Sequence, residues 1–232
     1  MTTDTPIHRP IRSFVVRQGR MTPAQKEAVS ADWPQYGIAL PEDGQAYDLN
    51  TVFGRESKRV LEIGFGMGAT LAKLAAENPQ ADFIGVEVHP PGIGRMLARA
   101  KTLELTNLKI FANDALDVLN LAIPDASLDR VLLLFPDPWP KSKHHKRRIV
   151  QPEFVELIAK KLKSEGFFHL ATDWQPYAEH MMTVLEASPS FTNYFGDELY
   201  APVGFERHTT KFEKRGEKLG HAIWDLIFQL NR

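Results

Sequence analysis

The sequence predicts an α/β fold built on a mostly parallel sheet. Short apolar runs alternate with longer segments of helical spacing from residue 58 onward, and alternating strands and helices form parallel sheets with right-handed crossovers. The apolar runs are nearly continuous, which is typical of strands that helices cover on both faces. One late segment alternates between polar and apolar side chains instead, so we expect a further strand there, added antiparallel.

The expected elements follow in order along the chain. Strands are predicted over residues 59–63, 82–88, 107–112, 129–135 and 166–172, and the late strand over residues 221–230. Helices are predicted over about residues 67–77 and 92–105, in a short stretch after residue 114, from residue 151 to about 162, and from residue 176. The last two begin with a proline in the first turn, where its missing N–H needs no partner. No linker interrupts these elements, so residues 51–232 are predicted to be one domain.

Residues 1–50 lack this pattern and are interpreted as a flexible basic arm and partial lid. Arginines stand at positions 9, 12, 17 and 20. Thr22 and Pro23 supply an N-cap and a first-turn proline, which predicts a short helix after Thr22.

The composition excludes several classes of protein. The chain has no cysteine, which rules out disulfides, thiolate metal sites and cysteine nucleophiles. Its net charge is −1, so binding to a nucleic acid would depend on clustered charge rather than on a global field. Residues 1–6 lack the apolar core of a signal peptide and no run is long enough to span a bilayer, so we expect a cytoplasmic protein.

A Gly-rich loop, Glu62-Ile63-Gly64-Phe65-Gly66-Met67-Gly68, joins the first strand to the first helix of the sheet. Glycine lets the backbone turn sharply and approach a ligand closely. The loop follows a strand and opens a helix, which is the context such a motif requires. Its GxGxG spacing differs from the GxGxxG of dinucleotide-binding enzymes.

Acidic residues end successive strands and predict the ligand of this loop. Glu87 could accept both ribose hydroxyls of a nucleoside, Asn113 and Asp114 could meet an adenine edge, and Glu62 could hold an ammonium group directly or through water. Each acid alone could equally be a helix cap or a solvated loop residue. A ring of carboxylates suits a cation and not a pyrophosphate, so we predict S-adenosylmethionine, which carries a sulfonium and an ammonium group and no phosphate.

The segment Phe135-Pro136-Asp137-Pro138-Trp139-Pro140 carries another carboxylate at the end of a strand. Pro138 disfavours helical geometry at Asp137, and the prolines fix φ and remove backbone donors. The segment therefore leaves the sheet as a rigid ledge at the carboxyl end of a strand, where open α/β sheets bind ligands. Trp139 could stack on a base or lie in the core, and a plain Pro-rich turn is the alternative for the whole segment.

The residues after the ledge, Lys141 to Arg148, form a dense cationic run that we interpret as a phosphate-binding stretch; a solvated charged loop is the alternative. His144 and His145 are adjacent and have no third ligand at a suitable spacing, so no metal site is predicted.

These segments resemble the bacterial tRNA (guanine-N7-)-methyltransferase family over nearly the whole chain. The matching pieces are Leu61–Gly68, Gly85–His89, Asn113–Ala115, Phe135–Trp139, His144–Gln151, Ala171–Trp174 and Thr210–Gly216, with Arg12–Phe14 and Arg17–Arg20 in the arm. The resemblance implies a Rossmann-like class I methyltransferase fold and methylation of a variable-loop guanosine of tRNA (guanosine 46) at N7. Pro140 and Ser142 occupy positions that vary in the family.

The resemblance also implies a role for individual residues. The methyl donor would be bound by Glu62, Gly64, Gly66, Gly68, Glu87, Asn113, Asp114 and Asp137, with Asp137 as the catalytic residue. The substrate would be bound by Lys141, Asp173, Thr210, Lys211, Phe212 and Glu213, and RNA would be contacted by Lys143, His144, His145, Lys146, Arg147 and Arg148. Thr210 and Glu213 also have the spacing of a helix capping box.

The chemistry of N7 shapes the expected mechanism. Guanine N7 already bears an in-plane lone pair, so methyl transfer needs no general base, and Asp137 is expected to orient the base and stabilise its developing positive charge. Three rival functions remain open: a nicotinamide-dependent oxidoreductase, a methyltransferase for another RNA or a small molecule, and a non-catalytic RNA-binding subunit. A monomer is expected, with a homodimer as the alternative.

Overall fold

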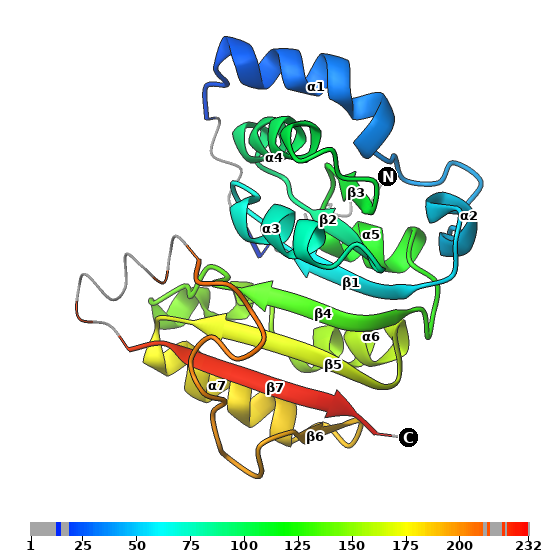
Figure 1. Ribbon diagram of the computed structural model, residues 1–232. Coiled ribbons are helices and arrows are strands. Elements are labelled where there is room, and N and C mark those ends of the chain that lie inside the picture. The colour runs from blue at the N-terminus through cyan, green and yellow to red at the C-terminus, as the bar shows by residue number, and fades with distance from the viewer. Residues whose placement is uncertain (1–12, 15–18, 211–212, 214–219, 221, 232) are drawn as a thin grey trace, which may run out of the picture.

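The computed structural model describes residues 13–14, 19–210, 213, 220 and 222–231. In this part of the chain, seven strands form one sheet in the order β3-β2-β1-β4-β5-β7-β6 (Figure 1). They are β1 (Lys58–Ile63), β2 (Ala81–Val86), β3 (Leu108–Phe111), β4 (Leu128–Leu134), β5 (Leu162–Thr172), β6 (Phe191–Asn193) and β7 (Trp224–Leu230). The helices are α1 (Pro23–Tyr36), α2 (Leu49–Phe53), α3 (Ala69–Glu77), α4 (Pro90–Thr102), α5 (Ala115–Leu121), α6 (Pro152–Lys161) and α7 (Gln175–Glu186), with a 3₁₀ helix η1 (Ser142–Arg147).

The strand directions confirm the predicted sheet. Strands β1 to β5 pair with one another in parallel only, and β7 pairs antiparallel with both β5 and β6. β1 has a parallel partner on each side, β2 and β4, so the chain builds outward to β3 and then returns to the other side of β1. The strand order reverses at this point, and open α/β sheets bind their ligands there, at the carboxyl ends of the strands.

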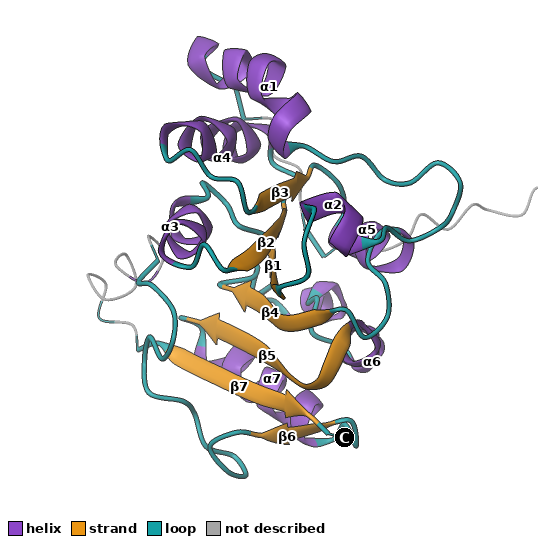
Figure 2. Ribbon diagram, turned by 45° about the vertical axis from the view of Figure 1, so that its right-hand side comes forward, coloured by secondary structure: helices purple, strands orange, loops and turns teal. Residues whose placement is uncertain are grey.

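Helices cover both faces of the sheet, as Figure 2 shows. On one face α5, α6 and α7 pack their buried side chains against β1, β4, β5 and β7 in the larger hydrophobic core. On the other face α1, α3 and α4 form a second core over β2 and β3. Where both faces are covered the strands are buried along their whole length: every residue of β2 is buried, and Asp82 is its one charged residue.

The structure differs from the expected elements at three places. β5 begins at Leu162, directly after α6, and is longer than the predicted strand over residues 166–172. β6 has only three residues, too few to show a period in the sequence. The short helix α2 begins at the N-cap Asp48, whose side chain accepts a hydrogen bond from the backbone of Asn50.

Helix α1 starts where the arm was expected to contain a helix, with Thr22 as its N-cap and Gln25 completing a capping box. It is packed along α4: Asp32 pairs with Lys101 at 3.0 Å, and the Tyr36 hydroxyl donates to the Ala100 carbonyl. Residues 23–36 therefore belong to the packed body, and the division at residue 50 stays a prediction. In the described part of the chain, none of the helices combines the length and the apolar character needed to cross a bilayer.

An ion pair with one buried partner fixes the opposite end of the sheet, away from the carboxyl ends of the parallel strands. Asp82, at the start of β2, has no exposed side-chain surface and accepts two hydrogen bonds from Arg55, at 2.6 and 2.9 Å. Ser57 donates to the other carboxylate oxygen of Asp82. All the charge of Asp82 is thus compensated locally, as a buried carboxylate requires.

Candidate active site

The Gly-rich loop after β1 has the backbone geometry that only glycine adopts readily. Gly64, Gly66 and Gly68 have φ values of 74°, 57° and 69°, in the left-handed region. At Gly68 a Cβ atom would also lie 2.3 Å from the sulfur of Met96. The loop shape therefore depends on these three glycines.

Glu87, just after β2, ties this loop to the neighbouring strand. Its carboxylate accepts hydrogen bonds from the backbone N–H groups of Gly66, Val88 and His89, at 2.8, 2.7 and 3.0 Å. These contacts hold the end of β2 and the turn of the loop in one fixed relation.

The carboxyl ends of the parallel strands surround a cavity of about 230 Å³. Six of the eight residues predicted to bind the cofactor line it: Gly64, Gly66, Glu87, Asn113, Asp114 and Asp137. Glu62 and Gly68 do not line it, although they lie on the same strand and loop. The arm adds two lining residues that the sequence-based site does not include, Ser13 and Phe14. The Arg12–Phe14 resemblance is the only sequence signal that points to them.

Glu62 has an unusual environment for a carboxylate. It is 4% exposed, and its Oε2 atom has no hydrogen-bond partner among the described residues. Burial, and then the nearby charge of Glu87, raise the pKa of Glu62 to about 8. A buried carboxylate without a partner is costly, and a cation placed beside it would remove that cost. Glu62 does not itself line the cavity, but Glu87, Asp114 and Asp137 do. The site therefore fits a ligand that carries an ammonium or sulfonium group.

Asp137 lies on a segment with a constrained backbone. Phe135 and Trp139, two residues before and after it, have left-handed φ values of 54° and 45°, which are uncommon for bulky side chains. Phe135 still donates its N–H to the Ala171 carbonyl of β5, so the chain leaves the sheet only after this residue. Asp137 itself is exposed and lines the cavity.

Trp139 lies outside the hydrophobic cores and contacts two other segments of the protein. It is partly exposed, and its indole N–H donates to the Ser13 carbonyl of the arm at 2.9 Å. The Arg147 guanidinium lies 4.2 Å from the centre of its ring, within the range of a cation–π contact. Trp139 thus joins the arm, the ledge and the basic segment, a role that neither sequence reading assigned to it.

The basic segment divides into exposed and buried residues. Lys141, Lys143 and Lys146 are exposed, whereas Arg148 is 4% exposed. The Arg148 side chain donates to the Pro138 carbonyl at 3.0 Å and lies over the Tyr177 ring. Three lysines therefore face solvent next to the ledge, while Arg148 holds the segment against it.

The residues predicted to bind the substrate are only partly described. Asp173 follows β5 and is partly exposed; Lys211 and Phe212 lie outside the described residues. Glu213 donates its N–H to the Thr210 hydroxyl at 3.0 Å, and its carboxylate accepts from the Thr210 N–H at 3.2 Å. These two contacts are those of the expected capping box, and both side chains are buried.

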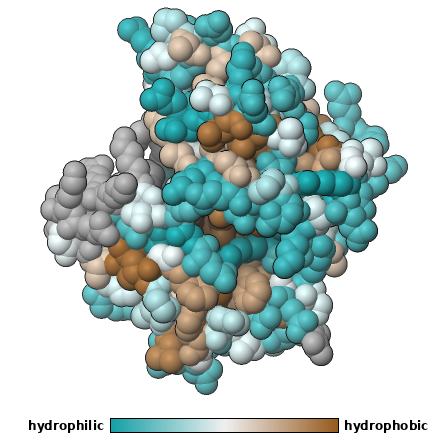
Figure 3. All heavy atoms as spheres, in the orientation of Figure 1, coloured by the Kyte–Doolittle hydropathy of each residue, from teal (hydrophilic) through white to brown (hydrophobic). Residues whose placement is uncertain are grey.

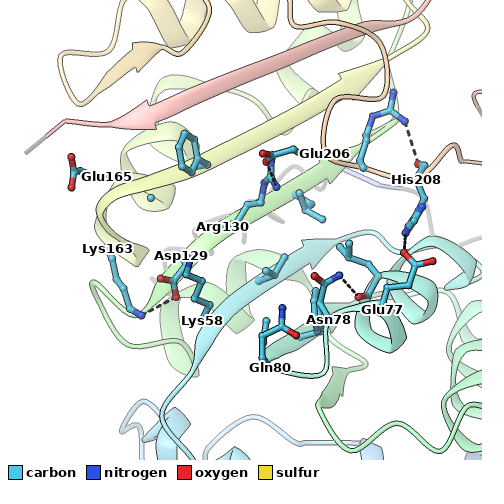
Figure 4. A pocket seen from close by; sticks show the side chains of 18 of the residues that line it. Lys58, Glu77, Asn78, Gln80, Asp129, Arg130, Lys163, Glu165, Glu206 and His208 are labelled. Carbon is cyan, nitrogen blue, oxygen red and sulfur yellow. Dashed lines mark hydrogen bonds and ion pairs between the residues drawn. The ribbon is translucent and has the colours of Figure 1, made fainter.

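A larger cavity, of about 860 Å³, lies on the sheet face between α3 and residues 204–208 (Figure 4). None of the predicted site residues lines it. Charged side chains of both signs surround it in Figure 4, and Figure 3 shows mostly hydrophilic side chains in the middle of this face. Several of its charges are already paired with one another, as with Lys163 and Asp129 or Arg130 and Glu206. We therefore place the chemistry in the smaller cavity.

The smaller cavity defines the class of this protein. A glycine loop after β1, an acid after β2 and an acidic ledge after β4 enclose a site that fits a cationic nucleoside ligand, on a Rossmann-like sheet with an antiparallel end. In the described part of the chain, no group of three or more His, Asp or Glu side chains is placed to hold a metal ion. The protein is a class I methyltransferase, and S-adenosylmethionine is its methyl donor.

Comparison with known proteins agrees with this class. A family model described as "Putative methyltransferase" matches residues 56–226. Among solved structures, the 16S rRNA methyltransferase KamB superposes with a TM-score of 0.59 at 16% identity, over 81% of this chain and 95% of that one; at that identity the likeness concerns the fold alone.

Two curated relatives are much more similar in sequence. The tRNA (guanine-N(7)-)-methyltransferase of Saccharophagus degradans is 57% identical over 94% of both chains. The protein of the same name from Ectopseudomonas mendocina is 53% identical over 99% of this chain and 95% of its own. The chain belongs to the tRNA (guanine-N(7)-)-methyltransferase family.

The raised pKa of Glu62 makes donor binding depend on pH. Its pKa of about 8 leaves the carboxyl mostly protonated at pH 7 without a ligand, and a bound cation favours the ionised form. We expect the wild type to release close to one proton per donor bound at pH 7, and its affinity to rise with pH up to about 8. Calorimetry in two buffers of different ionisation enthalpy measures the protons.

Glu62→Gln removes the titrating group, so it should release no proton and bind the donor more weakly at pH 8. Glu153→Gln, at an exposed carboxylate in the first turn of α6, should behave as the wild type. Equal proton release by wild type and Glu62→Gln would contradict the assignment of a cation to Glu62.

Proposed function

We propose that this enzyme transfers the methyl group of S-adenosylmethionine to N7 of the variable-loop guanosine of tRNA and forms 7-methylguanosine. The observation that supports this best is the position of Asp137: it lines the cofactor cavity, stands on a constrained ledge, and is followed directly by a segment with three exposed lysines. A carboxylate for the base and cations for the phosphates are thus adjacent.

The donor, when bound, supplies an electrophilic methyl group on a sulfonium. The acceptor N7 carries a free lone pair, so no residue has to remove a proton before the methyl is transferred. The protein has to hold the two reactants in line, and such pre-orientation can supply roughly 7–11 kcal/mol of the barrier. Rigidity of the ledge between Phe135 and Trp139 serves this positioning.

Asp137 has a second role in the proposal, because the guanine ring becomes positively charged as the new bond forms. Two unit charges 4 Å apart interact by about 1 kcal/mol in water and about 4 kcal/mol at an effective dielectric constant of 20. Asp137 is exposed without a substrate, so its effect grows only when the base covers it. Asp173, after the neighbouring strand β5, is proposed as a second acceptor for the base.

We propose cofactor contacts for four residues: Glu62, Glu87, Asn113 and Asp114. We also propose that the base leaves its stack, because chemistry on a buried base requires its extrusion. We also propose a cytoplasmic, metal-free monomer with a basic arm over residues 1–50 and one catalytic domain over residues 51–232. The arm residues Ser13 and Phe14 at the cofactor cavity support a lid role for the arm.

Product mapping tests the proposed function. Unmodified tRNA is incubated with the protein and a labelled methyl donor, and the product is cleaved chemically at 7-methylguanosine. We expect one cleavage site, in the variable loop. Label in tRNA without such cleavage would indicate another acceptor atom, transfer only to small molecules would support the small-molecule reading, and binding without any transfer would support a non-catalytic subunit.

Replacing Asp137 tests the charge role. Asp137→Asn keeps the size of the side chain and removes its charge, so the turnover rate at saturating donor and tRNA should fall at least tenfold. Asp117→Asn, at an exposed position of α5, should keep the wild-type rate. An Asp137→Asn rate within about threefold of wild type would mean that electrostatic stabilisation is not its role.

The three exposed lysines predict the salt dependence of tRNA binding. If each neutralises one phosphate, log K should fall with log salt at a slope of about −2 to −3. Lys143→Ala combined with Lys146→Ala should reduce the magnitude of this slope by about 1.5. Lys26→Ala combined with Lys73→Ala, on exposed positions of α1 and α3, is the matched control. An unchanged slope in the first double variant would exclude phosphate contacts by these lysines.

A further inference from the structure

A fully buried carboxylate, Asp225 on β7, lies at the centre of a polar network between the sheet and residues 201–210. Its side chain has no exposed surface. One oxygen accepts from His169 on β5 at 3.1 Å and from the Arg207 Nε. The other accepts from the Arg207 guanidinium at 2.7 Å and from the Gly204 N–H at 3.0 Å. All lone pairs of the Asp225 carboxylate are therefore used.

The donors in this network have a defined direction. Arg130 approaches the Nδ1 atom of His169 at 3.3 Å, and arginine can only donate, so Nδ1 accepts. The proton of a neutral His169 then sits on Nε2 and is donated to Asp225. Burial lowers the pKa of His169, which agrees with the neutral ring. Burial alone would raise the pKa of Asp225, but hydrogen bonds from His169 and Arg207 leave it below its ordinary value.

Arg207 extends the network to Glu213, part of the Thr210–Glu213 motif for which the resemblance implies substrate binding. Its guanidinium binds Asp225 on one side and the Glu213 carboxylate on the other, with the side chains of Arg207 and Glu213 only 1% and 3% exposed. Glu213 in turn accepts from the Thr210 N–H, and Thr210 accepts from the Glu213 N–H. The described side chains of the Thr210–Glu213 motif are thus occupied by contacts within the protein.

The same arginine lies beside the ledge. Its Cζ atom is 5.7 Å from the centre of the Phe135 ring, and Phe135 is the residue from which the ledge leaves β4 and one of those that line the cofactor cavity. Through Arg207, the motif and the ledge are therefore held side by side.

Two ion pairs on either side of Arg207 attach the same segment to the rest of the protein. Glu206 pairs with Arg130 of β4 at 3.0 Å, and His208 pairs with Glu77 at the end of α3 at 2.6 Å. Figure 4 shows the side chains of both pairs among those that line the larger cavity. These pairs are partly exposed and contribute little to stability, so the buried contacts of Arg207 dominate the position of the segment.

We propose that Arg207 and Asp225 are positioning residues for the methyl-transfer reaction: they fix Thr210 and Glu213 against the Asp137 ledge, and Glu213 acts through its contact with Arg207. The proposal rests on the proposed function, since it assigns the motif to the tRNA side of the site. The geometry favours a positioning role over a purely stabilising one, because Arg207, Asp225 and Glu213 connect the motif to the ledge. A buried group of ions also adds little stability compared with apolar side chains.

The test compares two matched arginine–aspartate pairs. Arg207→Lys keeps the charge but cannot reach Asp225 and Glu213 together, and Asp225→Asn keeps the shape but not the charge. For both we expect kcat/KM for tRNA to fall tenfold or more, with KM for the methyl donor within twofold of wild type. Arg55→Lys and Asp82→Asn alter an arginine–aspartate pair with a buried carboxylate at the far end of the sheet. They should change kcat/KM for tRNA less than twofold when all proteins are assayed well below their Tm.

A double-mutant cycle separates positioning from general loosening. If Glu213 acts through Arg207, Glu213→Gln should lower kcat/KM for tRNA in the wild type but have less than a twofold effect in Arg207→Lys, because the contact is already lost. Independent multiplication of the two effects would overturn the proposal, as would kcat/KM for tRNA within threefold of wild type in Arg207→Lys and Asp225→Asn. An equal loss of kcat/KM for the methyl donor and for tRNA would indicate a general loosening of the protein, and it would overturn the proposal as well.

Hydrogen exchange measures how firmly residues 201–207 are held, and the measurement does not depend on activity. In Arg207→Lys and Asp225→Asn, amides of residues 201–207 should exchange faster, while those of β1 and α3 should not change. Unchanged exchange at residues 201–207 would contradict the proposal even in an active enzyme. A wild type that does not methylate tRNA at N7 would refute the proposed function, and the exchange result would still decide whether Arg207 and Asp225 hold the segment.

Discussion

The reversal of strand order at β1 is the constraint on which the site depends. Because β1 has β2 on one side and β4 on the other, the connections that leave these strands diverge and open a space at their carboxyl ends. The glycine loop of β1, Glu87 after β2 and the ledge after β4 all meet there. The ledge would lie away from the glycine loop if β4 had been added beyond β3 instead of beside β1. The topology thus brings together residues that lie far apart in the sequence.

Topology places the loops near one another, and buried arginines then fix their positions. Arg148 donates to the carbonyl of Pro138 and so holds the ledge against the start of α7. Arg207 joins residues 201–210 to β7 and lies beside Phe135. Planar guanidinium groups suit this task because they can bind several acceptors in fixed directions. The exposed lysines of the basic segment are the cations that we propose to contact RNA, so in this proposal buried arginines hold the structure and exposed lysines bind the ligand.

The sequence predicted the parallel sheet and its late antiparallel strand, and six of its eight candidate cofactor residues line one cavity, since strand ends and glycine spacing are local signals. It did not predict β6, whose pairing depends on a partner far along the chain. It also grouped Arg148 with the cations that face RNA, although Arg148 is buried, because charge in a sequence does not reveal which side chain turns inward. Arg207 and Asp225 carry no motif of their own. Their relation exists only after β7 has paired with β5, which a linear pattern cannot show.

The position of β7 between β5 and β6 has a consequence for folding. β7 is synthesised after both strands that it joins, β5 and β6, so the edge of β5 stays unpaired while the preceding chain collapses. Unpaired strand edges favour association with other chains, and contacts between distant segments form slowly. Asp225 also arrives with β7, which leaves Arg207 and His169 without their common partner until that step. Assembly of the cofactor half of the enzyme can therefore precede that of the half proposed to receive RNA.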